Sequence, residues 1–241
     1  MKIGILQTGR TPDEMRVKHG DYDDLFKRML AGRGFDFDTY PVLDGILPGS
    51  VTDAQGWLIT GSKFGAYEGH DWIAPLEEFL RQAFGAGVPI VGVCFGHQVL
   101  AQALGGKVEK FSGGWSVGPT DYVGTDGGAE RVIAWHQDQV TQLPVGAEVI
   151  GSSAFCANAV LAYDTRALTL QPHPEFTADF MADLLEARRS VLPDHIAATA
   201  EARLGVRSFL QAIPVTPRCP KSRHGGGLFG PINTVTRHGN G

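Results

Sequence analysis

The chain has 241 residues, of which 43% are hydrophobic and 20% are charged, a composition typical of a water-soluble globular protein with a sizeable core. The net charge of −5 argues against nucleic acid as the main partner. No segment approaches the ~20 apolar residues of a membrane span, and the first apolar run is too short for a signal peptide. We therefore expect a cytoplasmic protein without a membrane partner. The three cysteines are too widely spaced for a disulfide framework or a paired-cysteine metal site.

Charge and composition change near the end of the chain. Residues 218–241 carry four basic side chains and no acidic one, and proline and glycine become frequent from residue 214. Such a stretch buries too little apolar surface to fold by itself. The sequence therefore predicts one domain over residues 1–213 and a disordered, basic Gly/Pro-rich tail over 214–241.

The first hundred residues alternate between predicted strands and helices. Apolar β-type runs predict strands, and apolar residues at helical spacing predict helices. The strands are expected at 2–7, 35–42, 56–60 and 88–93, and the helices at 22–31, 72–84 and 99–104. This alternation predicts an α/β protein with an open, mostly parallel sheet flanked by helices. Reactive groups in such a sheet gather beyond the carboxyl ends of the strands.

Short β-type runs follow residue 106 and predict a small antiparallel extension. Residues 164–166 are typical of a hairpin connection, and Thr177 is a good N-cap for a helix over 178–190. A further helix is expected at about 195–210. The predicted strands of the extension are 107–111, 115–123, 131–135, 148–152, 159–163 and 167–171.

Cys94 lies between the predicted strand at 88–93 and the helix that follows. Gly92 and Gly96 stand two residues away on either side. A nucleophile elbow needs small residues where strand and helix approach each other at a sharp turn. Such a turn exposes the sulfur at a helix N-terminus, where the helix dipole favours the thiolate. Cys94 is therefore a candidate nucleophile.

His173 and Glu175 are the candidate base and the candidate group that orients it. Their side chains point the same way if the segment is extended, and Pro172 and Pro174 prevent a helix there. The imidazole can exchange the thiol proton while the carboxylate fixes its tautomer. Zinc ligation by the same three residues would need a fourth ligand with matched spacing, which the sequence lacks. We therefore predict neither a metal nor a cofactor.

The loop at 60–65 follows the third predicted strand and contains Gly61 and Gly65. It can supply a backbone N–H for an oxyanion, or it can be a plain strand-to-helix turn. The residues alone leave both interpretations open.

Three motifs resemble the class I (triad) glutamine amidotransferases. They are Gly-Val-Cys-Phe-Gly-His-Gln at 92–98, Trp-His-Gln-Asp at 135–138 and His-Pro-Glu at 173–175. The Phe-Gly-His-Gln and Trp-His-Gln-Asp segments are similar to the glutaminase domain of GMP synthase and its free-standing relatives. The resemblance covers roughly residues 40–190 and implies the flavodoxin-like fold of that class over the domain at 1–213.

The resemblance also implies a mechanism. Cys94 would attack the side-chain amide of glutamine to give a γ-glutamyl thioester and ammonia. His173 would protonate the ammonia and later activate water, while Glu175 orients His173. The backbone N–H groups of Gly61 and Phe95 would form the oxyanion hole. The remaining implied role is substrate binding, by Gln98, His136 and Asp138.

Two departures from the family bear on function. Many members carry Gly-Gly-Pro in the oxyanion loop, where this chain has Thr-Gly-Ser at 60–62. GMP synthase continues into an ATP-pyrophosphatase domain, for which 241 residues leave no room.

The histidines of the motifs are ambiguous, since His97 can face the cleft or the core, and His136 can touch substrate or serve a structural hydrogen bond.

Three functions are compatible with the sequence. The first is a glutaminase that supplies ammonia to a separate synthetase partner. The second is a free-standing γ-glutamyl peptidase or hydrolase that acts on another γ-glutamyl small molecule. The third is a non-catalytic regulatory or binding subunit, which the intact triad disfavours.

Overall fold

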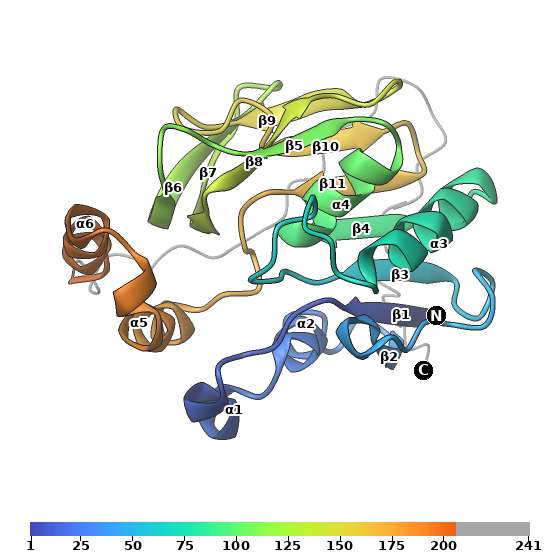
Figure 1. Cartoon of the computed structure of the whole chain (residues 1–241), viewed down its shortest axis with the longest axis horizontal. Coiled ribbons are helices and arrows are strands. Elements are labelled where there is room, and N and C mark those ends of the chain that lie inside the picture. The colour runs from blue at the N-terminus through green and yellow to red at the C-terminus, as the bar shows by residue number, and fades with distance from the viewer. Residues whose placement is uncertain (206–241) are drawn as a thin grey trace, which may run out of the picture.

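The computed structural model describes residues 1–205, which form a sheet flanked by helices on both faces (Figure 1). The nine-stranded sheet has the order β2-β1-β3-β4-β11-β10-β9-β6-β7, and β5 pairs with β8 separately. The tail at 214–241, the domain boundary at 213 and the end of the helix expected at 195–210 lie outside the described residues. The strands are β1 (Lys2–Gln7), β2 (Asp36–Pro41), β3 (Gly56–Ile59), β4 (Ile90–Val93), β5 (Lys107–Lys110), β6 (Ser116–Gly124), β7 (Ala129–His136), β8 (Asp138–Gln142), β9 (Glu148–Ser152), β10 (Val160–Tyr163) and β11 (Ala167–Leu170).

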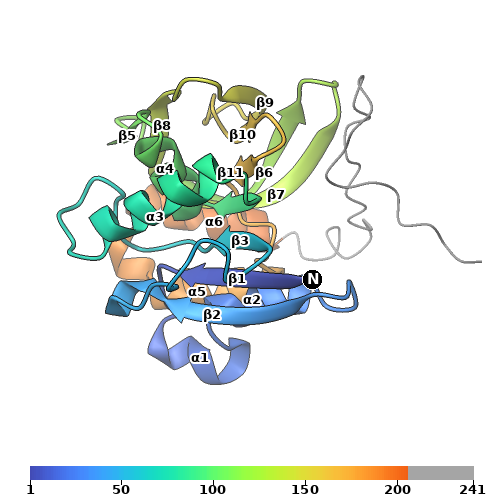
Figure 2. The same cartoon turned by 90° about the vertical axis from the view of Figure 1, so that its right-hand side faces the viewer.

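The parallel and antiparallel parts form one continuous sheet. Strands β2, β1, β3, β4 and β11 are parallel, while β10, β9, β6 and β7 are joined by antiparallel pairings. Figure 2 shows β2 near one end of the sheet and the β6–β7 hairpin at the other. Strand β11 is parallel to β4 on one side and antiparallel to β10 on the other. The structure therefore confirms the predicted fold class, and it inserts β11 directly beside the strand that precedes Cys94.

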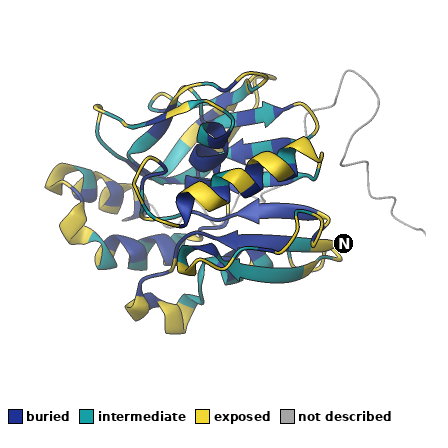
Figure 3. Cartoon of the chain, turned by 45° about the vertical axis from the view of Figure 1, so that its right-hand side comes forward, coloured by how far each residue is buried: buried dark blue, intermediate teal, exposed yellow. Residues whose placement is uncertain are grey.

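Helices cover both faces of the sheet and bury their apolar sides against it. The outer surface of α3 is exposed, while the strands behind it are buried (Figure 3). The helices are α1 (Asp13–His19), α2 (Tyr22–Met29), α3 (Ile73–Gly85), α4 (Phe95–Ala103), α5 (Ala178–Ala187) and α6 (Asp194–Gly205), with short 3-10 turns at Val42–Asp44 and Arg189–Val191.

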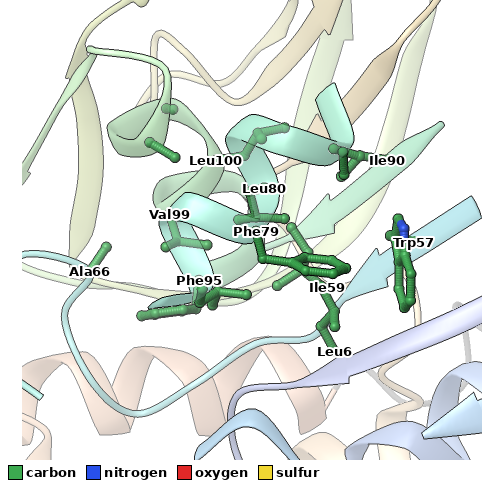
Figure 4. Packing of buried hydrophobic residues seen from close by; sticks show 14 of the residues in the cluster. Leu6, Trp57, Ile59, Ala66, Phe79, Leu80, Ile90, Phe95, Val99 and Leu100 are labelled. Carbon is green, nitrogen blue, oxygen red and sulfur yellow. The ribbon is translucent and has the colours of Figure 1, made fainter. Parts of the chain in front are cut away.

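The largest apolar cluster lies between the sheet and the helices α3 and α4 (Figure 4). Burying a large apolar side chain stabilises a fold by about 1.5–3 kcal/mol, so this cluster fixes where α4 sits on the sheet. Its position matters because α4 begins immediately after Cys94. The labelled members include Leu6, Trp57 and Ile59 from the sheet, Phe79 and Leu80 from α3, and Phe95, Val99 and Leu100 from α4.

Besides the 3-10 turns, one helix and one strand were not predicted from the sequence, and both are polar. Helix α1 buries only Met15, and its Val17 is almost fully exposed, so it shows no apolar stripe. Strand β8 buries Gln139 beside Val140, which breaks the usual alternation. By contrast, Thr177 caps α5 as predicted, since its hydroxyl oxygen accepts a hydrogen bond from the Phe180 N–H at 3.1 Å.

We expect Gly96→Ala to destabilise the fold by about 2–4 kcal/mol, because overpacking against rigid backbone is costly. A Cβ at Gly96 would lie 2.5 Å from the carbonyl oxygen of Ile59. Gly85→Ala is the matched control: nothing lies within 4 Å of a Cβ there, so the change should be neutral or stabilising by up to about 1 kcal/mol. Urea unfolding of both variants measures the difference, and equal stabilities would contradict the packing argument.

Candidate active site

Three neighbouring parallel strands end at the same place. Strands β3, β4 and β11 are consecutive in the sheet, and they lead into Gly61, Cys94 and the segment 171–175 respectively. The backbone N–H of Cys94 donates to the carbonyl oxygen of Leu170 at 2.7 Å. The β4–β11 pairing therefore brings the His-Pro-Glu segment beside Cys94, although about 80 residues separate them in the sequence.

Cys94 occupies a strained elbow. Its φ is +52°, a backbone conformation that residues other than glycine rarely adopt. The flanking glycines have the close contacts that the sequence predicted, since a Cβ at Gly92 would lie 2.5 Å from the carbonyl oxygen of Gly96. The first bond of α4 runs from the Gln98 N–H to the Cys94 carbonyl at 3.1 Å. The N–H groups of residues 95–97, which precede Gln98, therefore have no hydrogen-bond acceptor within the helix.

His173 and Glu175 form a buried pair next to Cys94. Nδ1 of His173 lies 2.8 Å from Oε1 of Glu175. Only 6% of Cys94, 4% of His173 and 6% of Glu175 is exposed. The backbone N–H of His173 donates to the carbonyl oxygen of Ile133 at 2.8 Å, which ties this segment to β7. Because the carboxylate of Glu175 accepts from Nδ1, Nε2 is the ring nitrogen of His173 that points away from Glu175.

The charge state of His173 is set by its two neighbours. Burial opposes the charged imidazolium, but the electrostatic interaction with Glu175 and Cys94 and the hydrogen bond to Glu175 outweigh it, so the pKa of His173 is raised. Among residues 1–205, Nε2 of His173 has no hydrogen-bond partner. The Cys94 side is therefore where His173 can exchange a proton.

Gly61 and Phe95 lie next to Cys94. A Cβ at Gly61 would be 3.0 Å from Cε1 of His173 and 3.8 Å from the Cβ of Cys94. Phe95 is the first residue of α4, so its N–H has no intrahelical acceptor. The structure thus brings together five of the predicted site residues: Gly61, Cys94, Phe95, His173 and Glu175.

Gln98, His136 and Asp138 form a second group beside the triad. Nε2 of Gln98 and Nδ1 of His136 both lie close to the carbonyl oxygen of Asp138, at 3.0 and 3.2 Å. Nε2 of Gln98 also donates to Oε1 of Gln171 at 3.1 Å. The side-chain nitrogen of Gln98 is therefore engaged by the protein, and the contacts show it holding Asp138 and Gln171 in place.

The Asp138 side chain faces the loop that follows β3. Burial raises the pKa of its carboxyl, partly opposed by a hydrogen bond from Tyr67 and the charge of Lys110. Burial and the Asp138 charge raise the pKa of Tyr67 to about 12, so its phenol stays neutral. Tyr67 is 46% exposed and was not singled out in the sequence, because a lone tyrosine in a loop carries no motif.

Phe176 is a second residue that the sequence analysis missed. Its ring stacks on the imidazole of His173, with centroids 4.0 Å apart and an interplanar angle of 8°. Phe180 backs it at 4.5 Å and Tyr22 at 6.3 Å. The stack leaves His173 little freedom to rotate. Only the position of Phe176 directly after the His-Pro-Glu motif could have signalled this.

His97 and Cys156 are interior residues. Nδ1 of His97 lies 2.8 Å from the hydroxyl of Thr169, and burial together with the nearby His136 lowers the pKa of His97 to about 3. Cys156 packs with Tyr122 and Ala159, and burial raises the pKa of its thiol to about 12. In residues 1–205 no group of three or more His, Cys, Asp and Glu side chains is arranged to hold a metal ion. No helix in the same range is long and apolar enough to cross a membrane.

Comparison with known proteins identifies the class to which this fold belongs. Residues 48–187 match the family model described as glutamine amidotransferase class-I. Gamma-glutamyl peptidase 4 of Arabidopsis thaliana is 30% identical over 228 residues, which cover 84% of this chain and 90% of the relative. The chain therefore belongs to the class I glutamine amidotransferase family, whose members are hydrolytic enzymes.

Two further proteins mark the range of the similarity. One is a component of the glutamine-hydrolyzing GMP synthase of Halobacterium salinarum, which is 32% identical over 166 residues, covering 65% of this chain and 85% of the relative. The other is the crystal structure of a glutamine amidotransferase from Thermotoga maritima, which superposes with a TM-score of 0.67 at 21% identity, covering 88% of this chain and 96% of that one. At this identity the superposition supports the fold alone.

We expect the free energy of unfolding to fall by about 3 kcal/mol between pH 7 and pH 5 because of His97 and His136. Burial lowers the pKa of His136 to about 4, with His173 adding to the effect, and that of His97 to about 3. Both stay neutral in the folded state while the unfolded chain binds protons near pH 6.5, so stability is lost as pH falls through that window. His173 has a raised pKa and is already protonated in the folded state, so it offsets this loss by less than about 1 kcal/mol.

Urea unfolding at pH 7 and pH 5 measures this loss. A His97→Gln variant should lose at least half of the pH dependence, whatever its stability at pH 7. An unchanged pH dependence in that variant would contradict the assignment.

Proposed function

We propose that this chain hydrolyses the amide bond at the γ-carbonyl of a γ-glutamyl compound through a thioester on Cys94. The observation that supports it most is the buried contact set of Cys94, His173 and Glu175 at one sheet edge, in a chain of this family. A nucleophile, a base within reach and a group orienting the base are the three parts that covalent catalysis of acyl transfer requires.

The reaction proceeds in two halves. The sulfur of Cys94 attacks the γ-carbonyl carbon, and His173 delivers a proton to the leaving nitrogen as the C–N bond breaks. The γ-glutamyl group is then a thioester on Cys94, and the amine or ammonia departs. Water next attacks the same carbon while Nε2 of His173 accepts its proton, which releases glutamate and restores the thiol. Glu175 holds the imidazole in its tautomer in both halves.

Each half passes through a tetrahedral oxyanion. Gly61 and Phe95 lie next to Cys94, and their N–H groups are the proposed donors to this oxygen. Fixed donors of this kind are typically worth about 3–4 kcal/mol each in the transition state.

The other end of the substrate carries an α-ammonium and an α-carboxylate. We assign the α-ammonium to Asp138, whose half-buried carboxylate lies beside the triad with a phenol, Tyr67, as its hydrogen-bond partner. Gln98 and His136 hold the Asp138 backbone and so fix that carboxylate.

Two substrate classes use the same chemistry. A γ-glutamyl peptide is favoured by the relative named gamma-glutamyl peptidase 4, which the chain matches over 90% of its length. Glutamine, with ammonia passed to a separate synthetase, is favoured by the relative named as part of a GMP synthase. We place the peptide first because that alignment spans more of both chains, and we keep glutamine as the second candidate.

We expect purified protein to release glutamate from γ-glutamyl dipeptides without a partner, and not from the matching α-glutamyl dipeptides. Incubation with both sets and with glutamine, read out by mass, makes the measurement. Cys94→Ala and His173→Ala should each lower kcat by several orders of magnitude on every active compound. Cys156→Ala, which removes a buried thiol outside the triad, should keep most of the activity.

The outcomes separate the candidates. If the protein turned over only glutamine, and only after a synthetase was added, glutamine would replace the γ-glutamyl peptide as the proposed substrate. Full activity in Cys94→Ala would overturn the thioester mechanism for both.

We expect Asp138→Asn to lower kcat/KM by about 10- to 100-fold, mainly through KM, because a charge-assisted hydrogen bond to the α-ammonium is lost. Asp36→Asn makes the same charge change at an exposed position on β2 and should leave both constants unchanged. Steady-state kinetics on one γ-glutamyl substrate compares the two variants. A normal KM in Asp138→Asn would remove Asp138 from the binding site.

A further inference from the structure

Two adjacent parallel strands end in the same dipeptide. Thr8-Gly9 follows β1 and Thr60-Gly61 follows β3, and both threonines are completely buried. The Thr8 N–H donates to the hydroxyl of Thr60 at 3.0 Å. The Thr8 hydroxyl lies 2.9 Å from the carbonyl oxygen of Thr60 and 3.2 Å from that of Gly61. Thr8 therefore contacts two successive carbonyl groups of the loop that passes Cys94.

These contacts fix the direction of the next two N–H groups. In a planar trans peptide the N–H points opposite to the C=O, and residues 1–205 contain no cis peptide bond. Because the carbonyls of Thr60 and Gly61 turn toward Thr8, the N–H groups of Gly61 and Ser62 turn away from β1. The sheet order is β1-β3-β4, so away from β1 is toward β4 and Cys94.

Gly9 also packs against this loop. A Cβ at Gly9 would lie 2.6 Å from the carbonyl oxygen of Gly61 and 2.8 Å from the Cα of Ser62. The backbone after β1 thus lies directly against the loop. The Thr-Gly-Ser segment at 60–62 has no proline to fix its dihedral angles, and it is held by these contacts together with the Thr60 hydroxyl, which donates to the Gly61 carbonyl oxygen at 3.1 Å.

We propose that Thr8 is a positioning residue that aims the N–H groups of Gly61 and Ser62 at the oxyanion formed on Cys94. Thr8 does not touch the substrate. Its hydroxyl contacts the carbonyl oxygens of the two peptide groups, and the N–H groups on their opposite side point toward the reacting carbon. The proposal rests on the proposed function, in that it requires an oxyanion at Cys94, and it adds Ser62 as a donor.

The test compares Thr8 variants with and without the hydroxyl. Thr8→Val keeps the shape of the side chain and removes the hydroxyl, and Thr8→Ala removes it with less volume. We expect both to lower kcat by about 10- to 100-fold with KM changed less than about twofold, since misaimed donors weaken binding of the transition state only. Thr8→Ser retains the hydroxyl and should keep at least about a third of the wild-type kcat.

A second measurement distinguishes misdirected N–H donors from a general disturbance of the structure around Cys94. Iodoacetamide alkylates Cys94 without forming a tetrahedral oxyanion, so its rate, followed by mass on the Cys94 peptide, should stay within about twofold of wild type in every Thr8 variant. Thr11→Val is the matched control, because the Thr11 hydroxyl is buried without a hydrogen-bond partner in residues 1–205. It should leave kcat and the alkylation rate unchanged.

Three results would overturn the proposal: a wild-type kcat in Thr8→Val or Thr8→Ala, an equal loss in Thr8→Ser, or a parallel fall in alkylation. None of them bears on the mechanism itself, which is tested by Cys94→Ala. Should Thr8→Val fail to fold, Thr8→Ala and Thr8→Ser still give the comparison.

Discussion

The pairing of β11 with β4 is the constraint on which the site depends. One hydrogen bond, from the Cys94 N–H to the Leu170 carbonyl, lies at the point where both strands end. Because the strands are parallel, the chain that leaves β11 must pass beside the sulfur. Any other register would carry His173 away from Cys94 or turn it to the other face of the sheet. The antiparallel extension matters for the same reason, since β10 and the bridge from His173 to Ile133 hold β11 and the segment after it.

Burial gives this arrangement its electrostatic character. The imidazole of His173 loses water on folding, which alone would favour its neutral form, yet Glu175 and Cys94 reverse that preference. The stacked ring of Phe176 closes the remaining side of the imidazole. His136, buried nearby without such a partner charge, stays neutral instead. Two histidines in similar burial thus have pKa values shifted in opposite directions because only one of them lies against Glu175 and Cys94.

The sequence predicted the parts of the site that carry a local signature. Gly92 and Gly96 indicate the elbow because only a missing Cβ permits the close approach. The prolines beside His173 correctly indicated that no helix forms there, but the segment is a turn and not extended, since the Phe176 N–H lies 3.4 Å from the His173 carbonyl oxygen. Apolar β-type runs predicted most strands. Helix α1 and strand β8 were not predicted because each buries a single apolar residue, Met15 in α1 and Val140 in β8. Thr8 was not predicted for a different reason: an ordinary threonine acquires its contacts only from Thr60 and Gly61, more than fifty residues away in the sequence. Phe176 stacks on a residue only three positions away, but a phenylalanine after the motif does not by itself indicate that stack.

The residues proposed to carry out the reaction differ from the residue proposed to bind the substrate. Cleavage of the γ-amide needs the sulfur, the imidazole and aimed N–H groups, and all of these come from the ends of β3, β4 and β11. In the proposed function, recognition of the glutamyl head is assigned to Asp138 at the start of β8, whose backbone carbonyl is contacted by Gln98 and His136. Neither group is assigned a contact with the leaving amine, whose size distinguishes glutamine from a γ-glutamyl peptide. Under this proposal, the choice between those substrates depends on residues other than Asp138, which binds the common glutamyl head, and other than the catalytic residues that both reactions share.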